Sequence, residues 1–220
     1  MTRLSRLLAL SALALLACNA QVKGNGELGH EHRTVAPFDQ VEVSLGFEAT
    51  ITANAAAQDL ELSGDTNLLP FILTPVEAGV LETRLHLVSS VDPINPLQLV
   101  ARATSLRRVK ATEASIIEVT GAGSAADGFS FEVEAAGQSS VTLAGPGGHE
   151  LQVTLTGASA LDASAYPVEV AQVALGGGAS LRVRSAGDVT GSADRSTVVV
   201  TGGGGCAALT LIGGATCQVR

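Results

Sequence analysis

The chain has 220 residues and a formal net charge of −8, with 25 glycines, five phenylalanines, one tyrosine and no tryptophan. So many glycines argue against a helical bundle, because each glycine costs roughly 1 kcal/mol in a helix interior. The acidic balance and the scarcity of lysine, present only as Lys23 and Lys110, argue against nucleic acid as a partner. We therefore expect an all-β protein.

The first residues have the order of an export signal. Arg3 and Arg6 precede the apolar stretch LLALSALALLA, which is too short for a membrane span of roughly 20 residues. The motif LLAC at residues 15–18 then resembles the bacterial lipobox. We predict a signal peptide over residues 1–17 and lipidation of Cys18, with an ordinary secretory signal as the alternative. Removing two arginines and no acid changes the net charge from −8 to −10.

Acyl chains on Cys18 would tether the protein to a membrane, because each buried methylene contributes about 0.8 kcal/mol. Asn19 stands where an inner-membrane retention signal usually has aspartate, which resembles sorting to the outer membrane. We therefore predict a membrane-anchored lipoprotein of the cell envelope, periplasmic or surface-exposed, with the outer membrane as its expected location.

Residues 18–34 are predicted to form a tether, and residues 35–220 the folded domain. His30-Glu31-His32 supplies only a partial metal site, so we interpret it as solvated tether and expect no metal or other cofactor. The stretch 35–62 alternates apolar and polar residues as a strand does, and residues 65–87 predict a helical turn followed by a strand. The basic cluster at 102–110 is read as a solvated strand edge rather than a binding patch.

A loose repeat begins near residue 97. A small tripeptide precedes alternating apolar residues at Glu113-Ala114-Ser115, Gly137-Gln138-Ser139, Gly157-Ala158-Ser159 and Gly178-Ala179-Ser180, so that the serines are 24, 20 and 21 residues apart. A period near 20 residues predicts a parallel β-solenoid with two or three short strands per coil. Stacked coils would place Ser115, Ser139, Ser159 and Ser180 in one column, where their hydroxyls can hydrogen-bond along the stack. Coincidence in a chain rich in Gly, Ala and Ser is the alternative, and an antiparallel sandwich is the rival fold.

Cys206 and Cys217 are expected to form a disulfide, because disulfides persist in exported proteins. Closing a loop of about 12 residues contributes roughly 3 kcal/mol in the chain-entropy model. At the last turns of a solenoid, such a bond would resist fraying. Two unpaired buried thiols are the alternative.

Several of these segments resemble a known bacterial family. They are Lys23-Gly24-Asn25-Gly26, the stretch VAPFDQVEV at residues 35–43, Asp65-Thr66-Asn67-Leu68-Leu69 and the later Gly-Ala-Ser repeats. Together, from Val22 to the end, they are similar to the "putative auto-transporter adhesin, head GIN domain" family. The resemblance implies a right-handed parallel β-helix, found on lipoproteins and secreted proteins. The chain departs from that family in a worn repeat near residues 191–193 and in the cysteine pair.

No catalytic residues emerge from the sequence. Asp127, Asp162, Asp188 and Asp194 stand alone near expected turns, and Arg182 with Arg184 is interpreted as outward-facing alternation. We therefore predict a non-enzymatic envelope protein for adhesion, surface recognition or envelope assembly, with an envelope protein or a glycan as partner. The alternative is a polysaccharide lyase or hydrolase, because parallel β-helices include such enzymes; fold alone does not favour it.

Overall fold

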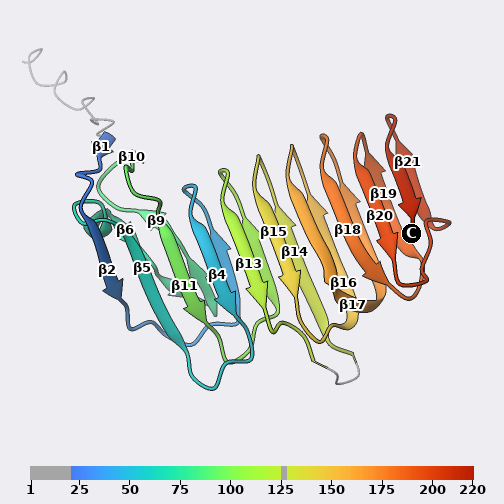
Figure 1. Ribbon diagram of the computed structural model, residues 1–220, viewed down its shortest axis with the longest axis horizontal. Coiled ribbons are helices and arrows are strands. Elements are labelled where there is room, and N and C mark those ends of the chain that lie inside the picture. Colours follow the sequence, from blue (N-terminus) through green and yellow to red (C-terminus); the bar gives the residue numbers. More distant parts are fainter. Residues whose placement is uncertain (1–20, 125–127) are drawn as a thin grey trace, which may run out of the picture.

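The computed structural model describes residues 21–124 and 128–220, and it shows a parallel β-solenoid whose coils stack along the long axis (Figure 1). The predicted signal peptide, Cys18 and Asp127 lie outside the described residues. The regular coils consist of two strands each: β12 (Arg108–Ala111) and β13 (Ile116–Thr120), β14 (Ser130–Ala135) and β15 (Ser140–Ala144), β16 (Gly148–Leu155) and the first part of β17 (Ala160–Leu175), the second part of β17 and β18 (Ser180–Ser185), β19 (Val189–Asp194) and β20 (Thr197–Thr201), and β21 (Leu209–Ile212) and β22 (Thr216–Val219).

The coils align in two parallel sheets. The first sheet contains β12, β14, β16, the second part of β17, β19 and β21, and the second sheet contains β13, β15, the first part of β17, β18, β20 and β22. In the second sheet, residue 140 pairs with 160 and residue 160 with 180. The predicted solenoid with coils of about 20 residues is therefore confirmed, with two strands per coil.

Strict alternation explains how these strands make a core. In β14, Phe131, Val133 and Ala135 are buried, while Ser130 and the two glutamates between them face outward. The same pattern in neighbouring coils stacks valine, leucine and alanine between the two sheets. Phe131 and Tyr166, whose ring centroids are 5.8 Å apart, are among the largest fully buried side chains of this core.

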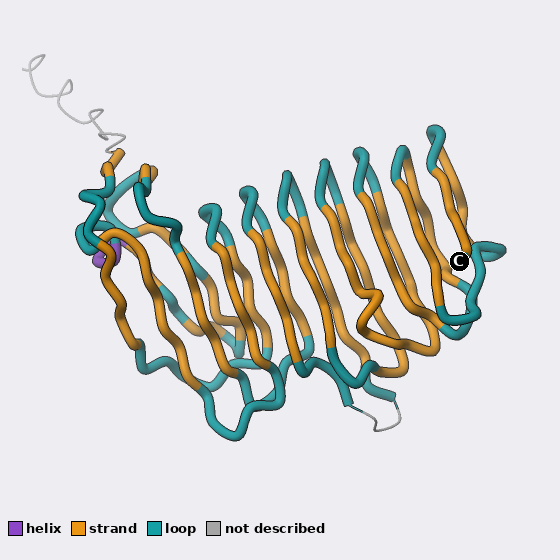
Figure 2. Tube along the Cα trace, in the orientation of Figure 1, coloured by secondary structure: helices purple, strands orange, loops and turns teal. Residues whose placement is uncertain are grey.

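One end of each coil is a narrow turn, and these turns are aligned along the solenoid (Figure 2). Equivalent positions at these turns have left-handed backbone, with φ of 76° at Gly137, 68° at Gly157 and 77° at Gly177. A Cβ at Gly157 would lie 2.9 Å from the carbonyl oxygen of Gly137 in the coil below. Glycine is therefore required there by backbone conformation and by the close approach of the neighbouring coil.

The N-terminal coils are interleaved rather than sequential. β3 (Gln40–Val43) pairs with β12, and β4 (Glu48–Thr52) lies between β13 and β11 (Gln98–Arg102). After β4 the chain forms the N-terminal cover and returns as β11, which pairs with β4 on the side away from β13. It then continues as β12, which pairs with β3. β5 (Asp59–Asp65) pairs antiparallel with β11, and β2 (Leu28–His32) pairs antiparallel with β5.

Short elements cover this N-terminal end. They are β1 (Gln21–Lys23) paired with β10 (Ser90–Asp92), the 3-10 turn η1 (Leu69–Phe71), β6 (Ile72–Leu73) paired with β9 (Arg84–Leu85), and β7 (Val76–Glu77) paired with β8 (Val80–Glu82), which also pairs with β3. The predicted helical turn followed by strand is thus present. The prediction of a tether over residues 18–34 is wrong for β1 and β2, which are paired strands, because their backbone groups complete the sheets at this end.

Asp65 is the hub of the N-terminal cover. Its buried carboxylate accepts hydrogen bonds from the backbone N–H of Gly26 at 2.8 Å and of Ile94 at 2.7 Å. Asn95 donates two more, from its backbone at 3.2 Å and its side chain at 2.7 Å. Burial raises the pKa of this carboxyl, but the four hydrogen bonds together lower it by more than burial raises it. The pKa of Asp65 is therefore below its ordinary value. Asp65 thereby ties the chain near residue 25 to the loop near residue 95.

Candidate functional site

The predicted serine column is present in three of its four members. Ser115, Ser139 and Ser159 are buried, and the N–H groups of residues 140 and 160 donate to the carbonyls of Ser115 and Ser139, each at 3.0 Å. The hydroxyls do not hydrogen-bond to one another. Ser159 Oγ lies within hydrogen-bonding distance of two carbonyl oxygens, that of Thr156 at 2.9 Å and that of Ala135 at 3.1 Å. The Oγ atoms of Ser115 and Ser139 have no hydrogen-bond partner among the described residues.

Ser180 does not belong to this column. It pairs with Ala160 and is exposed, and the buried position above Ser159 is filled by Ala179. The predicted spacing of 21 residues exceeds the coil by one, and a shift of one residue in a strand turns the side chain to the opposite face. Ser115, Ser139 and Ser159 are therefore part of the core, and they do not form a binding surface.

Cys206 and Cys217 form a disulfide with their Cα atoms 6.3 Å apart. It joins the segment before β21 to β22, so it closes the last described coil across the core. Within the described residues, no group of three or more His, Cys, Asp or Glu side chains is arranged to hold a metal ion. The pair of histidines on β2 instead contacts acids on β5: His30 Nδ1 lies 2.9 Å from Glu61 Oε1, and His32 Nε2 lies 3.5 Å from Glu61 Oε2.

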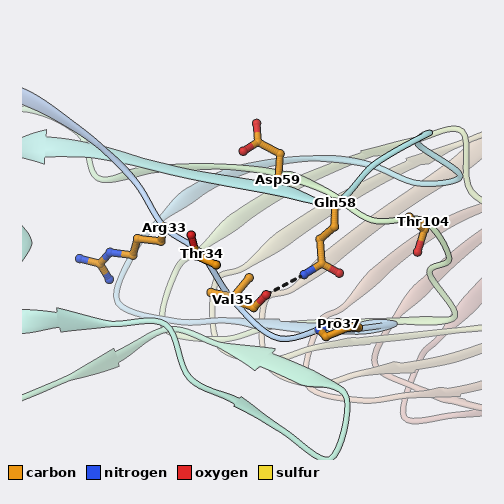
Figure 3. Close-up of a pocket in the computed structure, with 7 residues that line it drawn as sticks. All are labelled: Arg33, Thr34, Val35, Pro37, Gln58, Asp59 and Thr104. Atoms are coloured by element: carbon orange, nitrogen blue, oxygen red, sulfur yellow. Dashed lines mark hydrogen bonds between the residues drawn. The ribbon is translucent and has the colours of Figure 1, made fainter.

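A surface groove of about 430 Å³ lies beside the connection between β2 and β3. Its lining residues are Arg33, Thr34, Val35, Pro37, Gln58, Asp59 and Thr104 (Figure 3). Gln58 Nε2 donates to the carbonyl oxygens of Val35 at 3.3 Å, the bond drawn in Figure 3, and of Ala36 at 2.8 Å. The guanidinium of Arg33 turns away from the other lining residues and donates to the Ile72 carbonyl at 2.6 Å. These polar side chains bond to backbone carbonyls of neighbouring segments, so we interpret the groove as a structural contact between segments and not as a binding site.

The basic cluster at 102–110 is largely paired with acids. Arg108 lies 2.9 Å from Glu42 and 2.8 Å from Glu134, and Lys110 lies 3.2 Å from Glu42. Partial burial lowers the pKa of Arg108, but Glu134 and Glu42 raise it by more, so the pKa stays above its ordinary value. These cations stabilise the outer face of the first sheet and are not free to bind an anion.

A second groove, about 140 Å³, lies on the outer face of the second sheet near the C-terminal end. It is lined by Ser164, Arg182, Val183, Val199, Thr201 and Arg220. Arg184, which pairs with Thr201 in the adjacent coil, projects on the same face. We call Arg182, Arg184 and Arg220 the arginine groove.

The arginine groove is short of negative partners. Asp162 Oδ2 lies 4.0 Å from Arg182, at the limit of an ion pair, and the other carboxylate oxygen accepts hydrogen bonds from Ser164. Among the described side chains, no acid lies within ion-pair distance of Arg184 or Arg220. Three guanidinium groups that face solvent in an acidic protein can donate paired hydrogen bonds to a carboxylate, sulfate or phosphate.

Sequence reasoning placed Arg182 and Arg184 on an outward face, which the structure shows, but it did not connect them with Arg220. The link is the coil register: residue 182 pairs with 199 and residue 199 with 218, so the next outward positions, 184, 201 and 220, are in line across three successive strands of the second sheet. The isolated acids do not converge. Asp162 lies on the second sheet, and Asp194 on the first sheet contacts Arg195 at 3.4 Å.

Comparison with known proteins gives a family and a fold. The family model described as "Putative auto-transporter adhesin, head GIN domain" matches residues 37–205. A solved structure of a putative adhesin from Bacteroides fragilis aligns with a TM-score of 0.67 at 11% identity, over 90% of this chain and 98% of that chain. No curated protein has a significantly similar sequence.

Two solved structures from Parabacteroides are also similar. A protein described as a putative lipid binding protein from Parabacteroides distasonis aligns with a TM-score of 0.59 at 13% identity, over 91% of this chain and 100% of that one. A putative adhesin from Parabacteroides merdae aligns with a TM-score of 0.53 at 15% identity, over 91% and 99% of the two chains. At these identities the likeness establishes the solenoid fold. Within the described part of this chain, no helix has the length and apolar character needed to cross a bilayer.

Proposed function

This chain belongs to the "Putative auto-transporter adhesin, head GIN domain" family, and from that premise we propose that it is a non-catalytic recognition module of the bacterial cell envelope. Its ligand is an anionic glycan, which the arginine groove binds. Residues 1–17 direct export, and a lipid on Cys18 anchors the module to the outer membrane.

The arginine groove is the observation that carries this proposal. Guanidinium groups bind carboxylates and sulfates through paired hydrogen bonds, and such groups recur along acidic polysaccharides. A repeating ligand suits a solenoid, because equivalent outward positions recur in every coil. Arg182 and Arg184 lie on β18, Arg220 directly follows β22, and β20 lies between these two strands, so the groove spans three successive coils.

Binding to immobilised polysaccharides tests the proposal. The chain from residue 18 onward, with Cys18→Ser to exclude acyl chains, is passed over a sulfated glycan, a carboxylated glycan and neutral dextran. We expect binding to the acidic glycans only, and weaker binding as salt rises, because exposed charge pairs are screened. The triple variant Arg182→Gln, Arg184→Gln, Arg220→Gln should bind at least about tenfold more weakly.

Arg102→Gln is the matched control, because Arg102 is an exposed arginine on the outer face of β11, at the far end of the same sheet. Its affinity should equal that of the parent. Equal binding to dextran, or equal loss in Arg102→Gln, would overturn the proposal. Vesicles with and without anionic phospholipid form a second arm, because one structural neighbour is described as a putative lipid binding protein. Binding to these vesicles alone would assign the groove to lipid headgroups instead.

Two further measurements address location and catalysis. Protease treatment of intact cells should degrade the protein if the module faces outward, and spare it if it faces the periplasm. Incubation with acidic and neutral polysaccharides should release neither unsaturated nor reducing sugars. Release that is lost in Asp162→Asn would favour a polysaccharide-active enzyme.

A further inference from the structure

We propose that the N-terminal cover of the solenoid rests directly on the bilayer, with the side chain of Leu87 inserted among the lipid headgroups. We define this contact face as residues 21–22, where β1 begins, and residues 86–91, which lead into β10. The inference rests on the lipid anchor proposed for Cys18, and it adds the place where the folded domain touches the membrane.

The folded domain begins close to the proposed anchor. β1 starts at Gln21, three residues after Cys18, and three residues of fully extended chain span at most about 11 Å. The strand is fixed to the cover, because it pairs with β10 and because Asn67 Nδ2 donates to the carbonyl oxygen of Lys23 at 2.8 Å. An acylated Cys18 would therefore hold this part of the cover at the membrane surface.

The parallel pairing of β1 and β10 places Leu87 on the same side as the proposed anchor. Gln21 is in register with Ser90, so the residues before Gln21 and the residues before Ser90 approach the pair from the same side. Leu87 lies three residues before Ser90, just as Cys18 lies three residues before Gln21. Figure 1 shows this pair of strands at the N-terminal end of the solenoid.

Leu87 is presented to solvent by a strained loop. Its side chain is 80% exposed, the highest value among the large apolar side chains that the structure describes. Its backbone is left-handed, with φ of 64°, which is unfavourable for a leucine. The N–H of His86 donates to the carbonyl oxygen of Phe71 at 2.8 Å and so fixes the loop beside it. Strained backbone of this kind is concentrated at functional positions.

The contact face contains no acidic residue. Residues 86–91 have the sequence HLVSSV and residues 21–22 have the sequence QV, although the whole chain has a net charge of −8. At the edge of the face, Lys23 and Asp92 are register partners, so their charges offset each other. Because anionic headgroups repel acidic surfaces, this is a part of an acidic protein that can approach a bilayer closely.

The contact depends on the tether. The strength of a membrane contact follows the apolar area that it inserts, so one leucine would hold a free protein only weakly. A tethered domain meets the bilayer at high effective concentration, and the same contact then becomes favourable.

This contact sets how the arginine groove is presented. In the second sheet, β4, β13, β15 and the first part of β17 separate β18 from β11. At roughly 4.8 Å per strand, β18 therefore lies about 24 Å beyond β11 along the stack. A solenoid that rests on its N-terminal cover holds the arginine groove away from the membrane.

Tryptophan fluorescence tests this proposal, because the chain has no tryptophan of its own. The chain from residue 18 onward, with the disulfide formed, is coupled through the Cys18 thiol to a maleimide lipid in phosphatidylcholine vesicles. In Leu87→Trp, coupling should shift the emission to shorter wavelength, and brominated lipids should quench it at least about twofold, because the indole enters the headgroup region. Circular dichroism verifies that the variant keeps the parent fold.

Ile116→Trp and Val170→Trp are the matched controls. Ile116 is 51% exposed on the outer face of the second sheet, and Val170 is 39% exposed on the outer face of the first. Neither control should respond to coupling or to brominated lipids. Quenching at either position as strong as in Leu87→Trp would mean that the solenoid lies on a sheet face, and would overturn the proposal.

Hydrogen exchange of the unsubstituted chain gives a readout that needs no added tryptophan. On coupling to vesicles, residues 86–91 should exchange more slowly, while residues 116–120 should be unchanged. Absence of quenching in folded Leu87→Trp would refute the contact face, and so would unchanged exchange at residues 86–91.

Mass spectrometry of the full-length protein produced in bacteria separates failure of the contact from failure of the anchor. Cys18 without an acyl group would overturn the anchor, and this inference with it. An acylated Cys18 without the contact would overturn the inference alone. Neither result alters the glycan measurement.

Discussion

The two ends of the solenoid are built on different principles. At the N-terminal end, the strands are interleaved, Asp65 accepts four hydrogen bonds, and Arg108 and Lys110 contact acids on neighbouring strands. At the C-terminal end, coils repeat regularly, the arginine groove has few acidic partners, and the last coil is closed by a disulfide. Charges that are paired stabilise the fold, whereas the unpaired charges of a folded domain are available to a ligand.

Removal of the Asp65 carboxylate should break the N-terminal end and spare the C-terminal end. In Asp65→Ala, the N–H groups of Gly26 and Ile94 lose a buried partner, so we expect the largest stability loss of the variants discussed. Hydrogen exchange should show residues 21–32 and 90–96 losing protection while residues 180–201 keep theirs. Equal loss at both ends would show that the solenoid unfolds as one unit.

Acid should reproduce this effect. The folded pKa of Asp65 lies below its ordinary value, so its contribution is complete above the unfolded pKa of about 4 and is lost as the pH falls through the folded pKa. Thermal melting of the parent between about pH 6 and pH 2 should therefore show a decline that Asp65→Asn lacks. Parallel curves for the two proteins would contradict this assignment.

Loss of the disulfide should weaken the C-terminal end. In the double variant Cys206→Ser, Cys217→Ser, the closed loop is released in the unfolded state, and stability should fall by about 3 kcal/mol. Hydrogen exchange should locate the effect in β19 to β22. Urea unfolding of the parent with and without reductant gives an independent measurement, and a difference below about 1 kcal/mol would argue against the entropic account.

The left-handed positions at the narrow turns of the regular coils can be tested in both directions, by removing a glycine and by adding one. Gly157→Val forces a branched side chain into left-handed backbone against the coil below, and it should cost about 2 kcal/mol. Arg195→Gly is the reverse change, at a position with φ of 51°, and it should stabilise by about 1 kcal/mol, since the exposed contact to Asp194 contributes little. Urea unfolding of both variants provides the measurement.

The two arginine clusters should respond differently to the same substitution. Arg108→Gln leaves Glu42 and Glu134 facing each other, so it should cost roughly 1 kcal/mol or more. Arg182→Gln should change stability by less than about 0.5 kcal/mol, because its side chain is exposed and its nearest acid is 4.0 Å away. A stability loss at Arg182 as large as that at Arg108 would identify the arginine groove as structural.

Alternation and a repeat near 20 residues predicted the solenoid, because stacked coils must repeat their inward-facing residues. The exact register cannot be predicted from the tripeptides alone, because coil lengths vary. Ala179 takes the place of serine in the column, so the prediction of Ser180 for that position is wrong by one residue. The N-terminal end escaped prediction for a different reason. Its pairings join residues distant in sequence, such as 48 with 116, and no local pattern carries that information.

The same limit applies to the candidate site. Arg182 and Arg184 could be placed on an outward face from alternation within one strand. Their proximity to Arg220 depends on the lengths of the two coils between them, and the weakness of their acidic contacts depends on the positions of Asp162 and Ser164 in three dimensions.

The interleaving of the N-terminal coils restricts the order in which the molecule can assemble. β4 is held between β11 and β13, so its sheet position is complete only after residue 120 has left the ribosome. Such pairings give the N-terminal third a high contact order, and slow folding is typical of high contact order. The later coils, by contrast, each add to the one before. A fragment ending near residue 106 would therefore retain β3 and β4 with one side of each strand unpaired.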